Sequence, residues 1–456
     1  MAAVTAPKVS YAAWGGGAHA TAEVRAIRPA SVDAARRGYA SPGTSVLAFG
    51  NGRSYGDVCL NPGGTLIDCR SLDRFVDFDR TTGRLTCEAG VLLADILASI
   101  CRSDDTGGAW FLPVTPGTRF VSVGGAIAND VHGKNHHRFG TFGRHVLSFD
   151  LARSNGEVVS CSPTENAALY RATIGGLGLT GLVLRATIQL RRVEGTALEA
   201  EDVRFDRLDE FFSLAAEADQ AWDYTAAWVD CLATGRSLGR GIFSRARHRA
   251  GAGSPPPPLQ PRITIPVRPP VSLVGGLGLR AFNALYWRKL SLRRSERTVG
   301  GYEPVFFPLD AIGGWNRLYG PRGFFQFQCV VPPAVAAEAI KDMLGAVAAS
   351  GQGSMLAVLK TFGDLPSPGI LSFPMAGATL ALDFPDRGDS TRALLARLET
   401  ITVAAGGRLY PAKDCVMTAN TFRDGYAGLA AFKPHIDPAA ASGFARRVGI
   451  IGPAAS

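Results

Sequence analysis

The sequence lacks the features that mark several common protein classes. None of its eight cysteines forms a Cys-x-x-Cys pair, which argues against a structural zinc site and a thioredoxin-like redox centre. Scattered single cysteines are typical of buried thiols in a reducing compartment. The chain has no uninterrupted apolar run near the ~18–20 residues that cross a membrane, and residues 1–20 lack the apolar core of a signal peptide. We therefore expect a cytoplasmic protein, with any membrane contact peripheral and at the inner surface.

Excess positive charge is missing from most of the chain and is concentrated in one segment. The 456 residues carry a net charge of +9, while residues 236–300 alone hold thirteen Arg or Lys and a single acid, Glu296. Within this segment a run of four prolines opens a Pro-rich stretch that extends to about Pro270. Because proline lacks an N–H group and fixes its φ angle, we expect this stretch to be mobile and without regular helix or sheet.

Length and periodicity predict two or three domains with mixed secondary structure. Short strands separated by turns dominate residues 41–195, longer strands and helices follow, and residues 406–456 return to short turns. Alternating or continuous apolar runs predict strands at 45–49, 65–68, 182–190 and 378–384. Helical spacing of apolar residues predicts helices at 91–97 and 336–349.

The segment from Gly124 to His137 is the most informative part of the chain. It begins with small residues, which let a backbone approach a ligand closely, and ends with three imidazoles and one ammonium. These groups suit acid–base or anion chemistry. No carboxylate or thiolate lies at a helical spacing from them, so we expect no metal. The segment predicts a cofactor beside a reactive centre, with His136 and His137 structural.

Three glycine-rich turns could together hold a long diphosphate cofactor. Residues 50–57 follow a predicted strand, and their backbone N–H groups can form an anion nest to which Arg53 and Ser54 add a cation and a hydroxyl. Residues 116–125 form a second turn of this kind. Residues 176–181 match Gly-x-Gly-x-x-Gly, but they lead into an alternating strand and not into the helix of a dinucleotide fingerprint. We therefore predict a turn packed against a ligand or another strand.

These motifs resemble those of the PCMH-type, or vanillyl-alcohol-oxidase-type, FAD-linked oxidoreductases, and within them the branch that oxidises decaprenylphosphoryl-ribose. The resemblance is carried by residues 52–57, 113–118, 123–128, 132–137, 175–181, 326–328 and 406–414. It implies an α+β fold with three parts. These are a two-lobed FAD-binding domain at 1–195, a substrate domain at 196–405 and a C-terminal segment at 406–456 that returns to the FAD domain. The substrate domain would contain an antiparallel sheet covered by helices and a mobile basic loop at 245–270.

The same resemblance implies roles for individual residues. FAD contacts are expected at Arg53, Ser54, Tyr55, Gly56, Gly117, Thr118, Gly124, Gly125, Ala128, Asn129, His132, Gly178, Val183 and Lys413. Substrate contacts are expected at Lys134, Trp228, Asn316, Gln326, Gln328 and Lys360, and catalytic roles at His132, Tyr55 and Lys413. Many relatives attach FAD through a histidine in the first glycine loop. Because Arg53 stands at that position, the resemblance implies non-covalent FAD.

The activity implied is FAD-dependent oxidation of a secondary sugar hydroxyl, at C2′ of a polyprenylphosphoryl-β-D-ribose. The product would be the 2′-keto sugar, and a partner NAD(P)H-dependent keto-reductase would complete an epimerisation to arabinose. An imidazole or phenol can take the hydroxyl proton, an ammonium such as Lys413 would stabilise reduced flavin, and Lys134 or Lys360 could bind the phosphate. Phe306, Thr379 and Ala381 replace a tyrosine, an asparagine and a cysteine of the best-known members, which leaves the sugar open.

Two alternatives remain at this point. A sugar-lactone or alditol oxidase of the same flavin superfamily would need neither a phosphate site nor a membrane face. A nucleic-acid-binding protein could use the charge of residues 236–300, but that segment contains proline runs and few aromatic residues, and we expect no nucleic-acid partner. Our hypothesis for the segment is that residues 245–294 dock on an anionic membrane surface.

Overall fold

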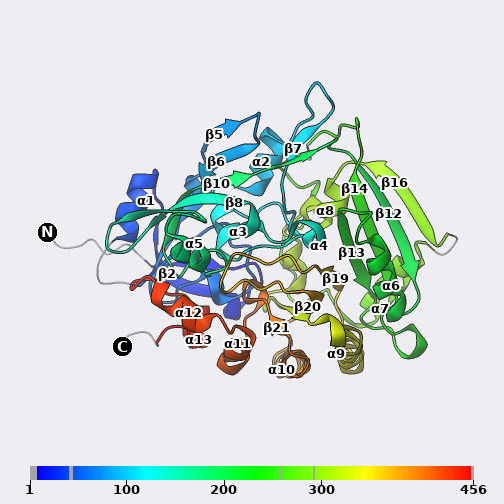
Figure 1. Ribbon diagram of the computed structural model, residues 1–456. Helices are drawn as coiled ribbons and strands as arrows, with labels where there is room; N and C mark the ends of the chain where they lie inside the picture. Colours follow the sequence, from blue (N-terminus) through cyan, green and yellow to red (C-terminus); the bar gives the residue numbers. More distant parts are fainter. Residues whose placement is uncertain (1–7, 41–44, 257, 291–292, 453–456) are drawn as a thin grey trace.

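The computed structural model describes residues 8–40, 45–256, 258–290 and 293–452. The predicted domains include residues 1–7, 41–44 and 453–456, the proline run includes Pro257, and the basic segment includes residues 291–292; all of these lie outside the described residues. The described strands form three large sheets and two small ones. In Figure 1 the two sheets built from the first half of the chain lie on the left, and the largest sheet lies on the right.

A four-stranded sheet is formed by the N-terminal segment. Its order is β1-β2-β4-β3, with β1 antiparallel to β2 and the other pairs parallel. The strands are β1 Lys8–Ala12, β2 Thr21–Ile27, β3 Val46–Phe49 and β4 Thr65–Asp68, and helix α1 Val32–Tyr39 precedes β3. Tyr39 of α1 is fully buried and packs into a cluster with Val46 and Ile67. This packing orients β3 and the glycine loop that follows it.

A five-stranded antiparallel sheet comes next, in the order β5-β6-β10-β8-β9. Its strands are β5 Phe75–Asp79, β6 Arg84–Glu88, β8 Val146–Ala152, β9 Val158–Cys161 and β10 Leu182–Gln189. Its helices are α2 Leu93–Ser99, α3 Val123–Ala128, α4 His136–Phe139 and α5 Ala167–Thr173. Two short strands, β7 Ala109–Phe111 and β11 Arg191–Val193, pair with each other. Helix α3 lies against β10, which positions the segment from Gly124 onward.

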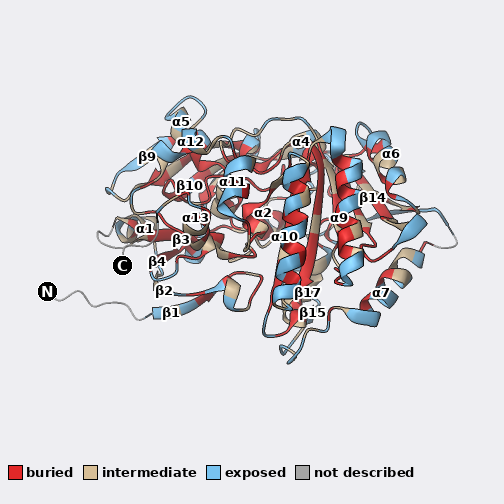
Figure 2. Cartoon of the chain, turned by 90° about the horizontal axis from the view of Figure 1, so that it is seen from below, coloured by how far each residue is buried: buried red, intermediate tan, exposed pale blue. Residues whose placement is uncertain are grey.

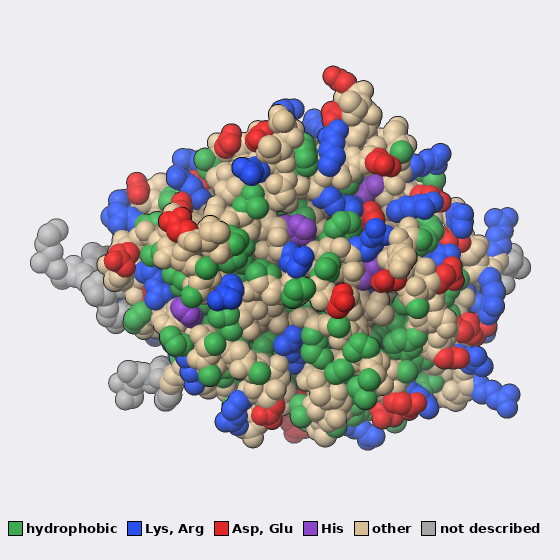
Figure 3. Space-filling view, in the orientation of Figure 1, with side chains coloured by type: hydrophobic (Ala, Val, Ile, Leu, Met, Phe, Trp, Pro, Cys, Tyr) green, Lys and Arg blue, Asp and Glu red, His purple; other side chains and the backbone are tan. Residues whose placement is uncertain are grey.

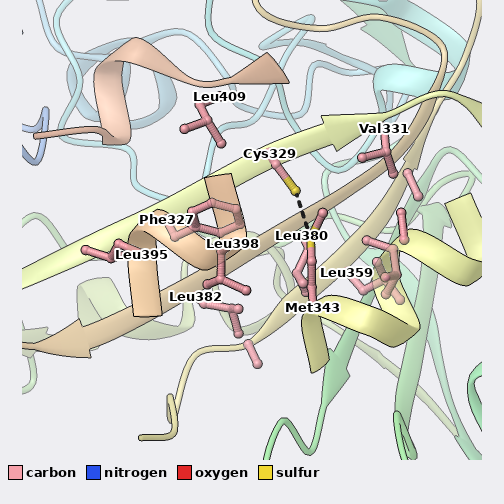
Figure 4. Packing of buried hydrophobic residues seen from close by; sticks show 14 of the residues in the cluster. Phe327, Cys329, Val331, Met343, Leu359, Leu380, Leu382, Leu395, Leu398 and Leu409 are labelled. Carbon is pink, nitrogen blue, oxygen red and sulfur yellow. Dashed lines mark hydrogen bonds between the residues drawn. The ribbon is translucent and has the colours of Figure 1, made fainter. Parts of the chain in front are cut away.

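An eight-stranded antiparallel sheet forms the rest of the core, in the order β16-β12-β14-β13-β19-β20-β18-β21. Its strands are β12 Leu198–Phe205, β13 Tyr224–Val229, β14 Gly241–His248, β16 Ser295–Gly300, β18 Phe324–Val331, β19 Val358–Phe362, β20 Gly377–Pro385 and β21 Arg408–Leu409. Helices α6 Leu208–Ala218, α9 Ala336–Ser350 and α10 Asp389–Ala404 cover one face (Figure 2). The apolar side chains of this face interdigitate with Met343 of α9 and Leu398 of α10 (Figure 4).

The two faces of this sheet differ because successive side chains of a strand point in opposite directions. On β18, Phe327 and Cys329 pack under the helices, while Gln326 and Gln328 point to the opposite side. The same alternation buries Leu359 of β19 and Leu380 and Leu382 of β20. The face away from the helices therefore presents polar and small side chains, and this face forms one wall of the site described below.

The remaining elements connect the sheets. They are β15 Ile263–Thr264, α7 Gly276–Arg288, α8 Glu303–Phe306, β17 Ile312–Gly313, α11 Ala419–Gly425, α12 Leu429–Phe432 and α13 Gly443–Arg447. Strand β15 pairs with β17 in parallel. The C-terminal segment contacts both halves of the molecule. Strand β21 pairs with β18, and the Gly443 N–H donates to Leu60 O while Arg447 forms an ion pair with Asp57.

Most of the predicted elements are confirmed, as is the mixed α and β composition with antiparallel sheets. The predicted strands appear as β3, β4, β10 and β20, and the predicted helices as α2 and α9, with ends that differ by one or two residues. The basic loop is the exception. Arg245 and Arg247 lie in strand β14, where they pair with acids of the neighbouring β12, so the start of the loop predicted at 245–270 is wrong. Within the proline-rich stretch Ile263–Thr264 forms a short strand, so the expectation that this stretch has no regular sheet is also wrong.

No helix in the described ranges is long and apolar enough to cross a membrane.

Candidate active site

A cavity of about 590 Å³ is lined by residues from all three large sheets. Its volume lies within the ~300–1,000 Å³ range typical of ligand sites. One wall consists of the loop after β3, residues 115–118, helix α3 with the residues that follow it, and the turn at 177–183. The facing wall is the side of β18, β19 and β20 that points away from the helices, and residues 259–261 and 308–315 form a third side. The cavity thus joins the glycine-rich turns to the polar face of the largest sheet.

The glycine-rich wall fits a closely bound cofactor. A Cβ added to Gly117 would meet nothing within 4 Å, so the backbone there faces open space. Gly178 has φ +75°, a conformation that glycine adopts readily, and the turn it belongs to runs directly into β10. Around this wall Arg53 Nε, Thr115 Oγ1 and Asn129 Oδ1 are buried without a hydrogen-bond partner in the described structure. Buried polar atoms normally have partners, so these atoms fit a polar ligand such as FAD.

Arg53 supplies a buried positive charge to this wall. Its guanidinium lies 4.2 Å from the ring centroid of Trp14 and 5.2 Å from that of Phe120. Burial lowers the pKa of Arg53, and the nearby Asp310 carboxyl opposes that shift. Asp310 itself accepts hydrogen bonds from the Thr118 hydroxyl at 2.8 Å and from the Arg119 N–H at 2.9 Å. The first and second glycine turns are thereby held side by side with a cation between them.

His132 lies at the junction of the two walls. Its Nε2 is 2.9 Å from the Gln328 amide nitrogen, which also donates to the Thr379 hydroxyl at 3.1 Å. An amide nitrogen is a donor, so Nε2 is the acceptor and the proton resides on Nδ1. Burial, and then the positive charge of Lys360, hold the pKa of His132 well below its usual range. The ring is therefore a neutral imidazole, the form that can accept a proton.

Asp130 holds the loop that carries His132. Its backbone has φ +40°, which is uncommon outside glycine. Its fully buried carboxylate accepts hydrogen bonds from the Gly143 N–H at 2.8 Å, the Ser372 hydroxyl at 2.5 Å and the Ser367 hydroxyl. Three donors from two separate segments thus converge on one side chain, which fixes the direction in which His132 projects.

We expect the substitution Asp130→Ala to lower the free energy of unfolding by about 2–5 kcal/mol, because buried donors left without an acceptor keep their desolvation cost. Asp130→Asn retains one acceptor oxygen and should lose less. Denaturant unfolding followed by circular dichroism measures both variants. An Asp130→Ala curve that superimposes on that of the unaltered protein would refute this role for the carboxylate.

Three lysines give the cavity an anion-binding character. Lys134 donates from Nζ to the Val305 carbonyl, Lys360 projects from β19, and Lys413 Nζ lies 3.9 Å from the ring centroid of Tyr55. Burial lowers the pKa of Lys134 to about 8, that of Lys360 to about 7 and that of Lys413 to about 8. The charges of Lys134 and Lys413 add to the shift of Lys360. A bound anion would relieve this mutual repulsion.

A buried carboxyl lies behind the cavity wall. Gln326 Nε2 donates to Asp383 Oδ1, and the Asp383 N–H donates to the Ser354 hydroxyl at 2.9 Å. Burial raises the pKa of Asp383 to about 7, and the positive charge of Lys413 opposes this rise. The negative charge of Asp383 in turn opposes the lowering of the Lys413 pKa by burial, since it favours the ammonium form. The charge of Lys413 therefore depends on Asp383.

The cavity brings together all but three of the candidate residues. Gly56 lies outside its lining because a Cβ there would be 1.9 Å from Asp414 O, so this glycine serves contact with the C-terminal segment. Trp228 also lies outside, donating to Met355 O at 3.0 Å. Asn316 lies outside as well and donates to Trp14 O at 3.1 Å. His136 and His137 also lie outside the lining.

Other lining residues had no assigned role in the sequence analysis. Tyr410 packs against His132 with ring centroids 5.1 Å apart and donates from its hydroxyl to Asn129 O at 3.1 Å. Asp310 and Trp14 hold the glycine turns through Thr118 and Arg53. The contacts of Tyr410 and Asp310 span more than a hundred residues of sequence, and that of Trp14 with Arg53 joins separate elements, so no local motif indicates them.

Phe306 and Ala381, which differ from the best-known members, both line the cavity. Thr379 precedes Ala381 by two residues on β20; it is buried behind the lining and accepts a hydrogen bond from Gln328. Two of the three substituted positions therefore line the cavity directly, and the third contacts it through Gln328.

Comparison with known proteins identifies relatives over nearly the whole chain. Residues 21–162 match the FAD binding domain. The chain is 37% identical over 406 residues to the decaprenylphosphoryl-beta-D-ribose oxidase of Mycolicibacterium smegmatis, covering 87% of this chain and 86% of that protein. It is 35% identical over 360 residues to a Streptomyces coelicolor protein of the mprA 5′ region, covering 75% of this chain and 96% of that one. A further match, at 30% identity over 195 residues, is to the L-gulono-1,4-lactone dehydrogenase of Mycobacterium tuberculosis and covers 40% of this chain and 43% of that one.

Proposed function

Because the chain belongs to the decaprenylphosphoryl-β-D-ribose oxidase family of FAD-dependent oxidoreductases, we propose that it oxidises C2′ of a polyprenylphosphoryl-β-D-ribose to the 2′-keto sugar. The observation that carries the proposal is the meeting of His132 and three part-buried lysines with a glycine-rich wall in one cavity. The wall belongs largely to the matched FAD-binding residues. The lysines suit a phosphorylated substrate better than a neutral lactone or polyol.

In this proposal FAD is bound without a covalent bond, since Arg53 stands where many relatives carry the attaching histidine. The FAD contacts would come from residues that line the cavity: Arg53, Ser54, Tyr55, Gly117, Thr118, Gly124, Gly125, Ala128, Asn129, His132, Gly178, Val183 and Lys413. Bound FAD supplies the acceptor for the hydride that leaves C2′. The sheets of residues 1–195 would be the two lobes of the FAD-binding domain, completed by residues 406–456, and residues 196–405 would supply the substrate side.

The side chains of the chain then have distinct tasks. His132 accepts the proton of the 2′-hydroxyl at Nε2. To leave this nitrogen available, Gln328 gives up its hydrogen bond to His132 and keeps the one to the Thr379 hydroxyl. Lys134 and Lys360 bind the phosphate, and Gln326 orients a ring hydroxyl. Lys413, above the ring of Tyr55, stabilises negative charge that develops on the flavin side.

The lysines predict how substrate binding depends on pH. The pKa of Lys360 is about 7, so its ammonium forms as the pH falls through that value and is lost as the pH rises. A phosphodiester stays singly charged over the same range. We therefore expect KM to rise about tenfold between about pH 6 and about pH 9 as the cation is lost. Steady-state kinetics over this range, with Lys360→Met as the comparison, provide the measurement.

The Lys360→Met variant should have a raised KM that varies much less with pH, the remainder coming from Lys134. A neutral sugar without the phosphate should give a flat profile with the unaltered enzyme. A KM that falls as the pH rises would contradict phosphate binding by these lysines.

The position of oxidation can be tested on the product. After anaerobic turnover of polyprenylphosphoryl-ribose, reduction with borodeuteride should place deuterium at C2′, as ribo and arabino epimers resolved by nuclear magnetic resonance. Deuterium at another carbon would overturn the assignment of C2′, while no incorporation would overturn the proposed oxidation itself.

The proposal also includes two partners. An NAD(P)H-dependent keto-reductase would consume the 2′-keto product, since an epimerisation needs a reduction after the oxidation. A peripheral contact with the inner membrane surface would give access to a substrate whose prenyl chain resides in lipid. The proposal includes no nucleic-acid partner.

A further inference from the structure

Exposed apolar side chains gather in one part of the chain. Of the fourteen large apolar side chains exposed in the described structure, eight lie between residues 259 and 285. They are Leu259, Ile263, Val267, Val271, Leu273, Leu277, Phe282 and Leu285. Single exposed apolar residues are ordinary, but such a concentration marks an interaction surface.

Helix α7 turns one of its faces outward. Its inner face is held by Asn283, which donates to Asp230 at 2.9 Å, by Leu279, which is buried, and by Tyr286, whose ring packs 4.7 Å from Trp228. On the outer face Leu277 is 85% exposed and Leu285 is 69% exposed. These two leucines are eight residues apart and so lie on the same side of the helix.

Arginines flank this apolar face. Arg280 and Arg288 are exposed on α7, and Arg268 and Arg293 lie before and after the helix. Within the described residues none of the four forms an ion pair. A helix with an apolar outer face and basic flanks is the arrangement found at membrane interfaces.

Most other cations of the basic segment are neutralised within the protein. Arg245 and Arg297 both pair with Glu201 of β12, and Arg247 pairs with Glu199. Lys289 pairs with Asp202, and Arg294 with Asp206. Figure 3 shows acidic and basic side chains interspersed along the right edge, where Figure 1 places β12 and β16. Apart from Arg236 and Arg249, the cations of the segment without an ion pair among the described residues are the four around α7.

The apolar surface is continuous with the cavity. Leu259 and Pro261 line the cavity, and β15 pairs with β17, whose two residues also line it. The Leu273 N–H donates to Leu318 O at 2.9 Å, which attaches the segment before α7 to the same region. Figure 2 shows α7, β15 and β17 along one edge of the molecule, with exposed residues on α7.

We propose that the docking face, formed by residues 259–273 and the outer side of α7, binds the surface of a lipid bilayer with anionic headgroups. The inference deepens the proposed function and depends on it for the substrate. Leu277 and Leu285 enter the acyl boundary, Arg280 and Arg288 contact headgroup phosphates, and residues 259–263 lead a prenyl chain from the bilayer to the cavity.

The holoenzyme can be tested by flotation with vesicles of phosphatidylcholine alone or mixed with phosphatidylglycerol. We expect flotation with the mixed vesicles and a loss of at least about tenfold in partitioning for Leu277→Glu with Leu285→Glu. Each of Arg280→Gln and Arg288→Gln should cost about fivefold with anionic vesicles. The matched control is Val76→Glu, which changes a similarly apolar, 51% exposed residue on β5, far from α7 in sequence. It should float like the unaltered enzyme.

The variants also separate this inference from the proposed oxidation. On a short-chain, water-soluble phosphoribose analogue, Leu277→Glu with Leu285→Glu should reduce the flavin at the unaltered rate. If the unaltered enzyme does not float with the vesicles, or if Val76→Glu loses as much partitioning, the proposed docking face is wrong. Neither result would count against the proposed oxidation. Self-association in sedimentation that Leu277→Glu abolishes would identify the face as a contact between two copies and overturn the lipid assignment.

Discussion

Replacing His132 by alanine should lower the rate of flavin reduction by substrate about 10²–10⁴-fold, the usual contribution of a positioned general base. His132 Nε2 is the acceptor nitrogen at the meeting point of the two cavity walls, and its pKa well below the usual range keeps it unprotonated. Because the imidazole is neutral throughout the neutral range, the rate should show no decline between about pH 7 and about pH 6 from protonation of this ring.

Rapid-mixing measurements of flavin absorbance under anaerobic conditions give this rate directly. The control is Gln328→Ala, which leaves the imidazole in place but removes the group that orients it, and should cost less. FAD content of both variants should stay unchanged in the absorbance spectrum. A His132→Ala enzyme that reduces its flavin within about threefold of the unaltered rate would remove His132 from the proposed mechanism.

Replacing Lys413 by methionine should have the second large effect, lowering both the flavin reduction potential and the rate of reduction. The ammonium above Tyr55 is buried, so its charge acts in a medium of low dielectric constant, where electrostatic stabilisation is strong. A loss of about 1.4 kcal/mol of stabilisation of reduced flavin corresponds to ~30 mV for a two-electron couple, and we expect a decrease of at least this size. The rate should fall about 10²-fold.

The potential is measured by dye-coupled reductive titration, which does not depend on substrate binding. Lys413→Arg, which retains a cation, is the control and should keep the potential near that of the unaltered enzyme. Asp383→Asn provides a second comparison. Because Asp383 favours the charged form of Lys413, its loss should make the potential fall more steeply as the pH rises above about 7. Equal potentials for Lys413→Met and Lys413→Arg would show that the charge does not act on the flavin.

The local parts of the fold were predictable because their signals are local. The strand at Thr65–Asp68 follows from a short apolar run between turns, and helix α9 follows from apolar spacing over four turns. The glycine turn at 176–181 was identified as a strand-leading turn because β-branched alternation follows it directly. Each of these depends on residues within about one element of each other, which a single sequence displays.

The polar wall of the cavity depends on strand pairing that the sequence does not display. Gln328 of β18 pairs with Ala381 of β20, and Ala381 pairs in turn with Val358 of β19. Lys360 reaches the same wall because it follows Val358 by two residues and so shares its face. The assignments of Gly56, Trp228 and Asn316 came from the resemblance alone, and the structure directs these residues to other contacts.

The basic segment shows why charge counted along a sequence differs from charge in space. Its excess over residues 236–300 suggested one positive pole, yet Glu199, Glu201 and Asp202 lie across from it on β12. Strand pairing brings these acids next to cations that follow them by more than forty residues. The positive charge proposed to contact a membrane is therefore the smaller group of arginines around α7.

The most direct test of the proposed activity is anaerobic bleaching of the flavin with a panel of polyprenylphosphoryl-ribose, aldonolactones and alditols. We expect the purified protein to be yellow from FAD and to be bleached rapidly and stoichiometrically by the phosphoryl-ribose, but not by the other two classes. Bleaching by a free lactone or polyol without response to the phosphoryl-ribose would contradict it, as would a protein that binds no flavin.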